Sequence, residues 1–224
     1  YPNRDDLKTS FTSVAEAGFE FIEVGLPFND PVADGPVISN AANSTIDSGI
    51  TTEEIIEDII SLKDISIQKY IMTYANIIYS YGIKKFSDRL KDCVDGIILA
   101  DVPNRMVNLF YDQGFEIPIV PFATPETRLE DIEIMNNSKS EFIYFVGVRG
   151  ITGSKADLQS DEIIHNIQAI KAKCDKKVIL GFGIKTKADA DSALSIADGF
   201  VVGTEAVKRQ GSNDFKQYVS SLIS

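Results

Sequence analysis

The chain has very little histidine and cysteine. His165 is the only histidine, and the two cysteines, Cys93 and Cys174, stand far apart and outside any CxxC pair. Because imidazole and thiolate groups supply most zinc sites and most nucleophile–base pairs, this composition disfavours metal-dependent and triad-type chemistry. We expect both cysteines to be small buried residues and His165 to lie on a helix. The scarcity of cysteine also favours a cytoplasmic protein without a disulfide framework.

Long apolar runs and an excess of basic residues are absent from the sequence as well. No stretch of about 18 apolar residues occurs, so we expect neither a transmembrane helix nor a signal peptide. With 22 basic and 33 acidic residues, the net charge is −11, and no basic stripe is present to bind nucleic acid. One phosphate group remains compatible with this charge, because backbone N–H groups can bind it locally.

What the sequence does contain is a series of seven short apolar runs, each ending in a polar or glycine-rich turn. Hydrophobic residues make up 44% of the chain, enough for a sizeable core. The runs are mostly continuous in Ile, Val and Phe, which is typical of parallel strands covered on both faces. The predicted strands span residues 20–25, 69–74, 96–100, 118–123, 142–147, 178–183 and 199–204.

Helical patterns separate these strands. Apolar residues recur on one face over 5–17 and again over 215–222, and a short helix is expected over 205–210. Capping signals occur at Thr51 with Glu54, at Ser160, and at Thr186 with Asp189. Strands that alternate with helices predict βαβ units with right-handed crossovers.

The expected fold is α/β, a TIM (β/α)8 barrel, formed as one domain over residues 1–224. A closed barrel needs eight strands, whereas seven are recognised and a helix precedes the first. We therefore expect the first strand to be missing from this chain, ending just before Tyr1. An open, doubly wound sheet is the alternative fold.

Two carboxylates in the segment FIEVGLPFNDPVADGP are the candidate catalytic groups. Glu23 is predicted at the end of the first strand, among apolar neighbours that would raise its pKa. Asp34 follows in a loop fixed by prolines and glycine. Two carboxylates presented in this way suit general acid/base chemistry. The alternatives are structural: Glu23 could bond a nearby backbone group, and Asp34 precedes Gly35, a typical turn sequence.

Three glycine sites after the last strands suggest a phosphate-binding corner. They are the turn from Gly181 to Gly183, the pair Gly203 and Thr204, and the loop that contains Thr152 and Gly153. Free N–H groups at such turns can bind phosphate without Lys or Arg. Each glycine alone is equally compatible with a tight turn. The loop VRGITGSKADLQ is either a lid or an ordinary βα loop.

Apolar residues at or near the predicted strand ends could form a flat slot for an aromatic ring. These are Ile38, Met72, Tyr74, Ile98, Ala100 and Tyr144. Simple barrel packing is the alternative for each of them.

These motifs together resemble the tryptophan synthase alpha family. EVGLPFNDPVADGPVISNA is similar to its signature, with Asn29 where Ser is usual. YANIIYSYG, ILADVP, PFATPETR, FIYFVGVRGITG, GFGI and VVGTEAV follow in the family's order, so the resemblance covers essentially the whole chain. It departs at Thr204, where Ser is common, and at residues 147–149, which replace a Ser-containing start of the lid loop.

The resemblance implies a TIM barrel that cleaves indole-3-glycerol phosphate to indole and glyceraldehyde 3-phosphate. It makes Glu23 the catalytic acid/base, Asp34 the carboxylate that binds the indole N–H, and Thr152 the lid residue that meets Asp34. It assigns the phosphate to Gly153, Gly183, Gly203 and Thr204, and the substrate pocket to Tyr144, Tyr74 and Ile38.

The same resemblance implies an α2β2 assembly in which indole passes to a beta subunit. Pyridoxal phosphate would belong to that partner, and this chain would need no cofactor. Docking would involve the loop around Asp30 and neighbouring loops at the barrel mouth. Three alternatives remain open at this point: a stand-alone lyase that releases indole, a non-catalytic activator of the beta subunit, and a different phosphate-binding barrel.

Overall fold

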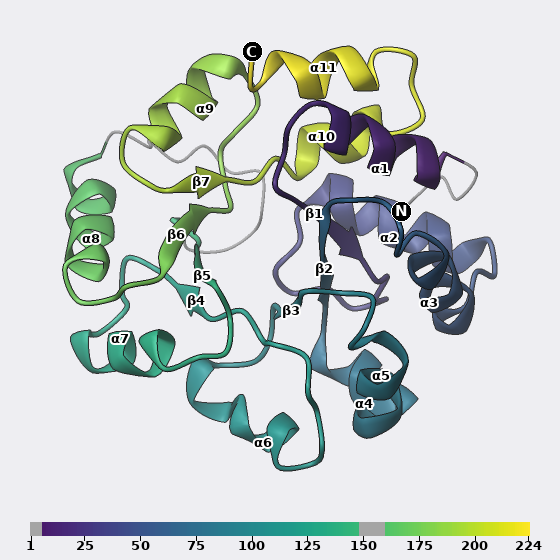
Figure 1. Cartoon of the computed structure of the whole chain (residues 1–224), viewed down its shortest axis with the longest axis horizontal. Helices are drawn as coiled ribbons and strands as arrows, with labels where there is room; N and C mark the ends of the chain where they lie inside the picture. The colour runs from purple at the N-terminus through teal and green to yellow at the C-terminus, as the bar shows by residue number, and fades with distance from the viewer. Residues whose placement is uncertain (1–5, 148–159) are drawn as a thin grey trace.

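The strands form a ring of parallel β-structure with helices around its outside (Figure 1). The structure, a computed structural model, describes residues 6–147 and 160–224. One sheet runs in the order β1-β2-β3 and a second in the order β4-β5-β6-β7. A parallel bridge between Ile97 and Ile119 joins the two sheets. Sequential strand order and this junction distinguish the fold from a doubly wound sheet, and it is an α/β barrel of the TIM type.

Each predicted strand corresponds to a strand of the ring. The strands are β1 (Phe21–Gly25), β2 (Gln68–Thr73), β3 (Gly96–Leu99), β4 (Phe122–Ala123), β5 (Phe142–Phe145), β6 (Lys177–Leu180) and β7 (Gly199–Phe200). Most of the predicted ranges were too long, and the largest differences are at β4 and β7, which are two-residue strands. Pro118 and Pro121 cannot donate hydrogen bonds within the first of these runs. The second run turns at Gly203 into a helix.

The helices that alternate with these strands lie on the outside of the ring. They are α1 (Leu7–Glu16), α2 (Pro36–Asp47), α3 (Thr52–Ser61), α4 (Ala75–Tyr81), α5 (Ile83–Leu90), η1 (Asn104–Met106), α6 (Asn108–Tyr111), α7 (Leu129–Asn136), α8 (Asp161–Lys171), α9 (Lys187–Leu194), α10 (Thr204–Arg209) and α11 (Phe215–Ser221). Both predicted capping boxes are confirmed, at the starts of α3 and α9. Ser160 caps α8 as predicted.

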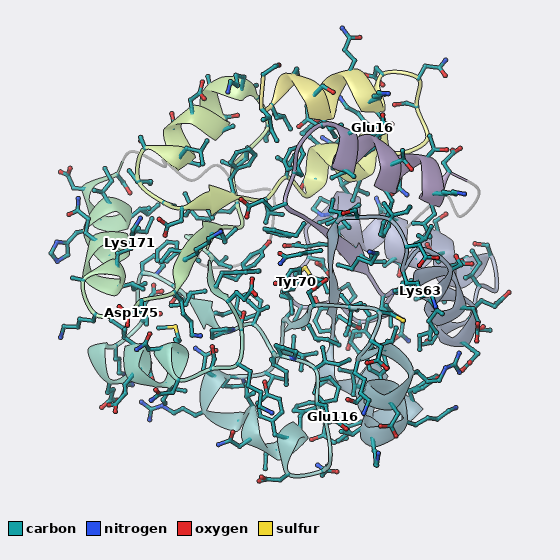
Figure 2. The ribbon with its side chains drawn as sticks, viewed as in Figure 1. Glu16, Lys63, Tyr70, Glu116, Lys171 and Asp175 are labelled. Atoms are coloured by element: carbon teal, nitrogen blue, oxygen red, sulfur yellow. The ribbon has the colours of Figure 1, made fainter. Side chains whose placement is uncertain are left out.

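Side chains alternate between the barrel interior and the helices. On β5, Phe142 and Tyr144 pack inward, whereas Ile143 and Phe145 pack against the helical layer. Tyr70 of β2 lies near the middle of the molecule, in contrast to peripheral residues such as Lys171 (Figure 2). Because both faces of the strands are covered, continuous apolar runs were the correct signal for parallel strands.

A seam separates β1 from β7, which have no ladder between them in the described part of the chain. The cavity described below extends along this seam, past Phe11 and Val14 of α1. Elsewhere, His165 is exposed on α8, Cys174 is buried and Cys93 is half-buried, both as free thiols. Within residues 6–147 and 160–224, no helix is long and apolar enough to cross a membrane.

Candidate active site

A cavity of about 420 Å³ extends from the barrel interior along the seam between β1 and β7, and five of the predicted site residues line it. Its lining includes Glu23, Asp34, Ile38, Tyr74 and Gly203. They come from β1, the loop after it, the start of α2, the end of β2 and the loop after β7. Residues distant in sequence therefore share one chamber, as the carboxyl ends of barrel strands would predict.

Glu23 is the third residue of β1 and lies two residues before Gly25, the residue at which the strand ends both in the structure and in the predicted range 20–25. Its register partner on β2 is Tyr70, and Phe21, which has the same parity, packs into the inner core. Alternation along the strand therefore directs Glu23 into the barrel.

The Glu23 carboxyl group is buried and sparsely hydrogen-bonded. Its Oε2 accepts a long hydrogen bond of 3.5 Å from the Tyr144 hydroxyl. Its Oε1 is inaccessible to solvent and has no partner among the described residues. Burial raises the Glu23 pKa from 4.5 to about 8, opposed only in part by the bond from Tyr144. Glu23 is therefore a protonated acid at neutral pH, able to give a proton and take it back.

Tyr144 is held against Glu23 by the neighbouring strand. A methyl group at Gly181 would lie 1.8 Å from the Tyr144 ring atom Cε1, so the ring occupies the space that any side chain there would need. Burial, followed by the charge and hydrogen bond of Glu23, raises the pKa of Tyr144. Its hydroxyl consequently stays a hydrogen-bond donor.

Asp34 is fixed by a tyrosine from another element. The Tyr74 hydroxyl donates a 2.9 Å hydrogen bond to Asp34 Oδ2. Burial raises the pKa of Asp34, and this hydrogen bond acts against the rise. The Asp34 side chain is thus bonded to a residue at the end of β2 and not to a backbone group of its own turn. This favours a role for Asp34 in the active site over a purely structural role in the turn.

The predicted aromatic slot is formed in part. Met72 lines the cavity with Ile38 and Tyr74, whereas Ile98 belongs to the inner core beside Tyr144. Ala100 does not line the cavity. The lining residues that were not predicted include three that also belong to the inner core: Phe21, Ile179 and Val201. The two-residue alternation of inward side chains was the signal that could have identified them.

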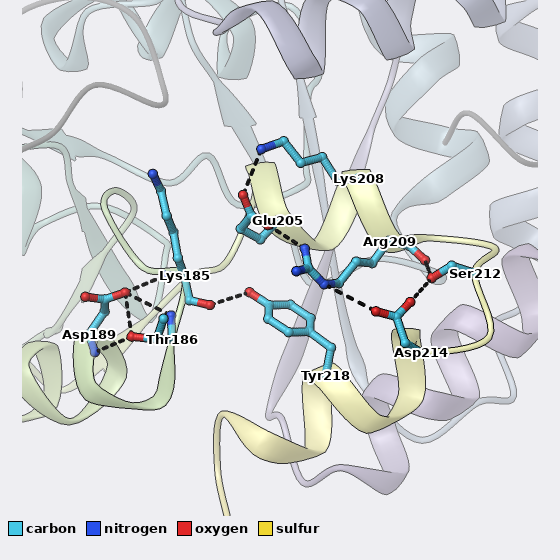
Figure 3. Close-up of polar contacts among 9 residues, drawn as sticks. All are labelled: Lys185, Thr186, Asp189, Glu205, Lys208, Arg209, Ser212, Asp214 and Tyr218. Atoms are coloured by element: carbon cyan, nitrogen blue, oxygen red, sulfur yellow. Dashed lines mark hydrogen bonds and ion pairs between the residues drawn. The ribbon is translucent and has the colours of Figure 1, made fainter.

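The predicted capping box forms at the start of α9, close in sequence to the predicted phosphate residue Gly183. Asp189 Oδ2 accepts hydrogen bonds from the N–H groups of Lys185 and Thr186, at 3.0 and 2.8 Å (Figure 3). The amide groups of Lys185 and Thr186 are thus occupied by the capping box. Gly183, at φ +78°, and Thr204 do not line the cavity. The predicted residues Thr152 and Gly153 lie outside the described residues.

Gly203 remains the best-placed member of this corner. It precedes α10, for which no side-chain cap is observed. A Cβ atom at Gly203 would lie 3.7 Å from Ile38 Cδ1, so Gly203 borders the apolar wall. Backbone N–H groups at this position are compatible with a phosphate.

The basic side chains of α10 are already engaged. Glu205 forms ion pairs with Lys208 and Arg209 (Figure 3). Arg209 also lies over the Tyr218 ring, 4.5 Å from its centroid, and the Tyr218 hydroxyl donates to Lys185 O at 3.0 Å. This cluster fixes α9, α10 and α11 relative to one another. A phosphate here would depend on backbone groups more than on these cations.

Residues 6–147 and 160–224 contain no cluster of three or more His, Cys, Asp and Glu residues placed to hold a metal ion.

Comparison with known proteins identifies one family over nearly the whole chain. Residues 1–222 match the family model described as tryptophan synthase alpha chain. The tryptophan synthase alpha chain of Bacillus cereus (strain B4264) is 32% identical over 223 residues, 98% of this chain and 86% of that protein. Its counterpart from Thermotoga petrophila is 34% identical over 213 residues, 93% of this chain and 85% of that protein.

Solved structures agree with this match. A chain from Aquifex aeolicus superposes with a TM-score of 0.87 at 31% identity, covering 99% of this chain and 88% of that one. A chain from the tryptophan synthase α2β2 complex of Pyrococcus furiosus gives 0.86 at 26% identity, covering 99% and 92%.

Proposed function

Because this chain belongs to the tryptophan synthase alpha chain family, we propose that it cleaves indole-3-glycerol phosphate to indole and glyceraldehyde 3-phosphate. It is thus a carbon–carbon lyase of tryptophan biosynthesis. One observation carries the assignment of the chemistry: Glu23, whose pKa is about 8, lines the same cavity as Asp34. A protonated acid and a second carboxylate in one apolar chamber are what this cleavage requires.

In the first step we assign Glu23 the role of acid. Its proton is transferred to C3 of the indole ring, which makes the ring an electron-accepting leaving group. The positive charge that develops at the ring nitrogen is stabilised by the Asp34 carboxylate, which accepts a hydrogen bond from the indole N–H. An oriented carboxylate in a cavity with little water stabilises such charge more strongly than solvent does.

In the second step the Glu23 carboxylate acts as base. It takes the proton of the 3′-hydroxyl group while the bond between indole C3 and C3′ breaks. The electron pair of that bond returns to the ring, and C3′ becomes the aldehyde carbon of glyceraldehyde 3-phosphate. Glu23 is protonated again, so the site is ready for another turnover.

The remaining site residues are assigned to binding. We place the indole ring against Ile38, Tyr74 and Tyr144, with Met72 and Phe21 as further apolar contacts. The phosphate is assigned to backbone groups of Gly203 and Thr204, with Gly183 and Gly153 nearby. Thr152 is the proposed lid residue that meets Asp34. The cavity lining supports the assignments of Ile38, Tyr74 and Gly203 directly.

A beta subunit is the proposed partner. The Pyrococcus furiosus neighbour is described as part of an α2β2 complex. By the same family relationship, the chain assembles with a beta subunit into α2β2 and passes indole to it. Pyridoxal phosphate belongs to that partner, and the location of the assembly is the cytoplasm.

Residues 1–224 are proposed to form a single barrel domain. The observed alternation of strands and outer helices supports this organisation.

The test measures cleavage of indole-3-glycerol phosphate by the chain, with and without a cognate beta subunit. The release of indole is the readout. Slow cleavage alone and strong acceleration by the partner are expected. Rapid cleavage without the partner would instead identify a stand-alone lyase. If neither condition gives cleavage, the chain is an activator of the beta subunit or acts on another phosphate ester, and the assignment is wrong.

A further inference from the structure

The hydroxyl group of Tyr74 is buried between two groups of the loop that follows β1. It donates to Asp34 Oδ2 at 2.9 Å and accepts from the Ala33 N–H at 3.1 Å. Tyr74 is only 4% exposed. A buried hydroxyl with both a donor and an acceptor in one loop fixes the position of that loop, because releasing it would leave buried polar groups unpaired.

The ring of Tyr74 contacts the same loop at a third point. Its centroid lies 4.9 Å from that of Phe28, with an interplanar angle of 31°. Phe28 precedes Asp34 by six residues and also lines the cavity. The loop after β1 is therefore held near both of its ends by one side chain, that of Tyr74, which directly follows β2.

The backbone of Tyr74 is anchored in turn from the next strand. Tyr74 is the N-cap residue of α4, and its own side chain makes no capping bond. Instead, Asp101 Oδ1, just beyond β3, accepts a 2.8 Å hydrogen bond from the Ala75 N–H. An acidic group at a helix N-terminus is a stabilising cap. The loops after β1, β2 and β3 are thus connected through Tyr74.

We propose that Tyr74 is a positioning residue that orients the Asp34 carboxylate, and that Asp101 anchors it. Tyr74 holds Oδ2, so that Oδ1 is directed to the indole N–H. This inference rests on the proposed function and goes beyond the assignment of Tyr74 as an apolar wall of the pocket.

Removal of the Tyr74 hydroxyl has two expected consequences. The carboxylate loses its fixed orientation, so charge stabilisation in the transition state weakens and kcat falls about tenfold or more. The ionised form of Asp34 also loses a hydrogen bond, so the pKa of Asp34 rises. Burial and the nearby Asp34 and Asp101 raise the Tyr74 pKa, and the hydrogen bond from the Ala33 backbone only partly opposes this rise, so the Tyr74 hydroxyl remains a donor throughout the working pH range.

The test compares Tyr74→Phe with Tyr81→Phe. Tyr81 is a matched control because its hydroxyl also donates to a carboxylate, Glu53 Oε2 at 2.7 Å, but outside the cavity. In Tyr74→Phe we expect the acid limb of the kcat/KM profile to move up by about one pH unit. The affinity for glyceraldehyde 3-phosphate should stay unchanged. The pH profile of kcat/KM for Tyr81→Phe should be the same as that of the wild type.

A second readout does not depend on turnover. The ¹³C carboxyl resonance of Asp34, identified by its loss in Asp34→Asn, reports its titration directly. We expect a higher midpoint in Tyr74→Phe and no change in Tyr81→Phe. Coincident titrations in all three proteins would overturn the positioning role, even with cleavage intact. Absence of cleavage in the wild type, with the Asp34 midpoint shifted in Tyr74→Phe, would overturn the proposed function and leave the positioning of Asp34 supported.

Asp101→Ala tests the anchor separately, since it leaves the Tyr74 hydroxyl in place. We expect a smaller loss of kcat with the same phosphate affinity. Unchanged kcat would remove Asp101 from the inference.

Discussion

The ring of Tyr144 covers the Cα atom of Gly181 so closely that a methyl group there would lie 1.8 Å from ring atom Cε1. The same tyrosine hydroxyl is 3.5 Å from Glu23 Oε2. Because Gly181, directly after β6, has no side chain, the Tyr144 ring on β5 can occupy this space. The position of that ring in turn determines the surroundings of the Glu23 carboxyl group on β1.

We predict that Gly181→Ala both destabilises the barrel and lowers activity. The added methyl group must displace the Tyr144 ring, and overpacking of this kind costs about 1–3 kcal/mol of unfolding free energy. Urea unfolding and steady-state cleavage measure the two effects. Gly25→Ala is the control for stability alone, because a Cβ atom there would meet no atom within 4 Å but would border the cavity. Equal unfolding free energies of the two variants would contradict the role assigned to the ring.

The raised pKa of Glu23 makes a prediction about stability and pH. Between pH 4.5 and about 8, folded Glu23 keeps a proton that the unfolded chain has lost. The unfolded state binds fewer protons, so the contribution of Glu23 to stability decreases as pH rises through this window. Glu23→Gln removes that penalty, and its Tm relative to wild type should therefore be higher at pH 8 than at pH 5.

Glu20→Gln serves as the control for this titration, since the Glu20 side chain is 76% exposed at the start of the same strand. Its Tm difference from wild type should change little between the two pH values. A Glu23→Gln difference that is equally independent of pH would show that Glu23 ionises normally in the folded protein.

Asp34→Asn should separate charge from loop structure. The amide keeps an oxygen that can accept the Tyr74 hydrogen bond, but it loses the negative charge that faces the indole nitrogen. We expect kcat to fall about 100-fold while binding of glyceraldehyde 3-phosphate, followed by calorimetry, is retained. Comparable losses of both would indicate that the loop has collapsed and that the charge is not the main contribution.

Much of the fold could be predicted because its signals are local. Continuous apolar runs identified every strand of the described ring, and the capping boxes at Thr51 and Thr186 formed as expected. Glu23 and Asp34 were recognised from one segment, and both line the cavity. Glu23 lies two residues before Gly25, where the strand ends both in the prediction and in the structure.

The features that could not be predicted depend on register between distant segments. Tyr74 meets Asp34 only because β2 lies beside β1, and Tyr144 crosses Gly181 only because of the pairing between β5 and β6. At α9 the predicted capping box is present, and it engages the N–H groups of Thr186 and Asp189.

The most direct measurement is cleavage of indole-3-glycerol phosphate in D2O, in the presence of a beta subunit that lacks its own substrate, followed by NMR. The wild-type chain should release indole with deuterium at C3, delivered by Glu23. Glu23→Gln should be folded and slower by about 1000-fold or more, while Glu20→Gln remains active. Release of indole by Glu23→Gln at a rate near that of wild type would contradict the account.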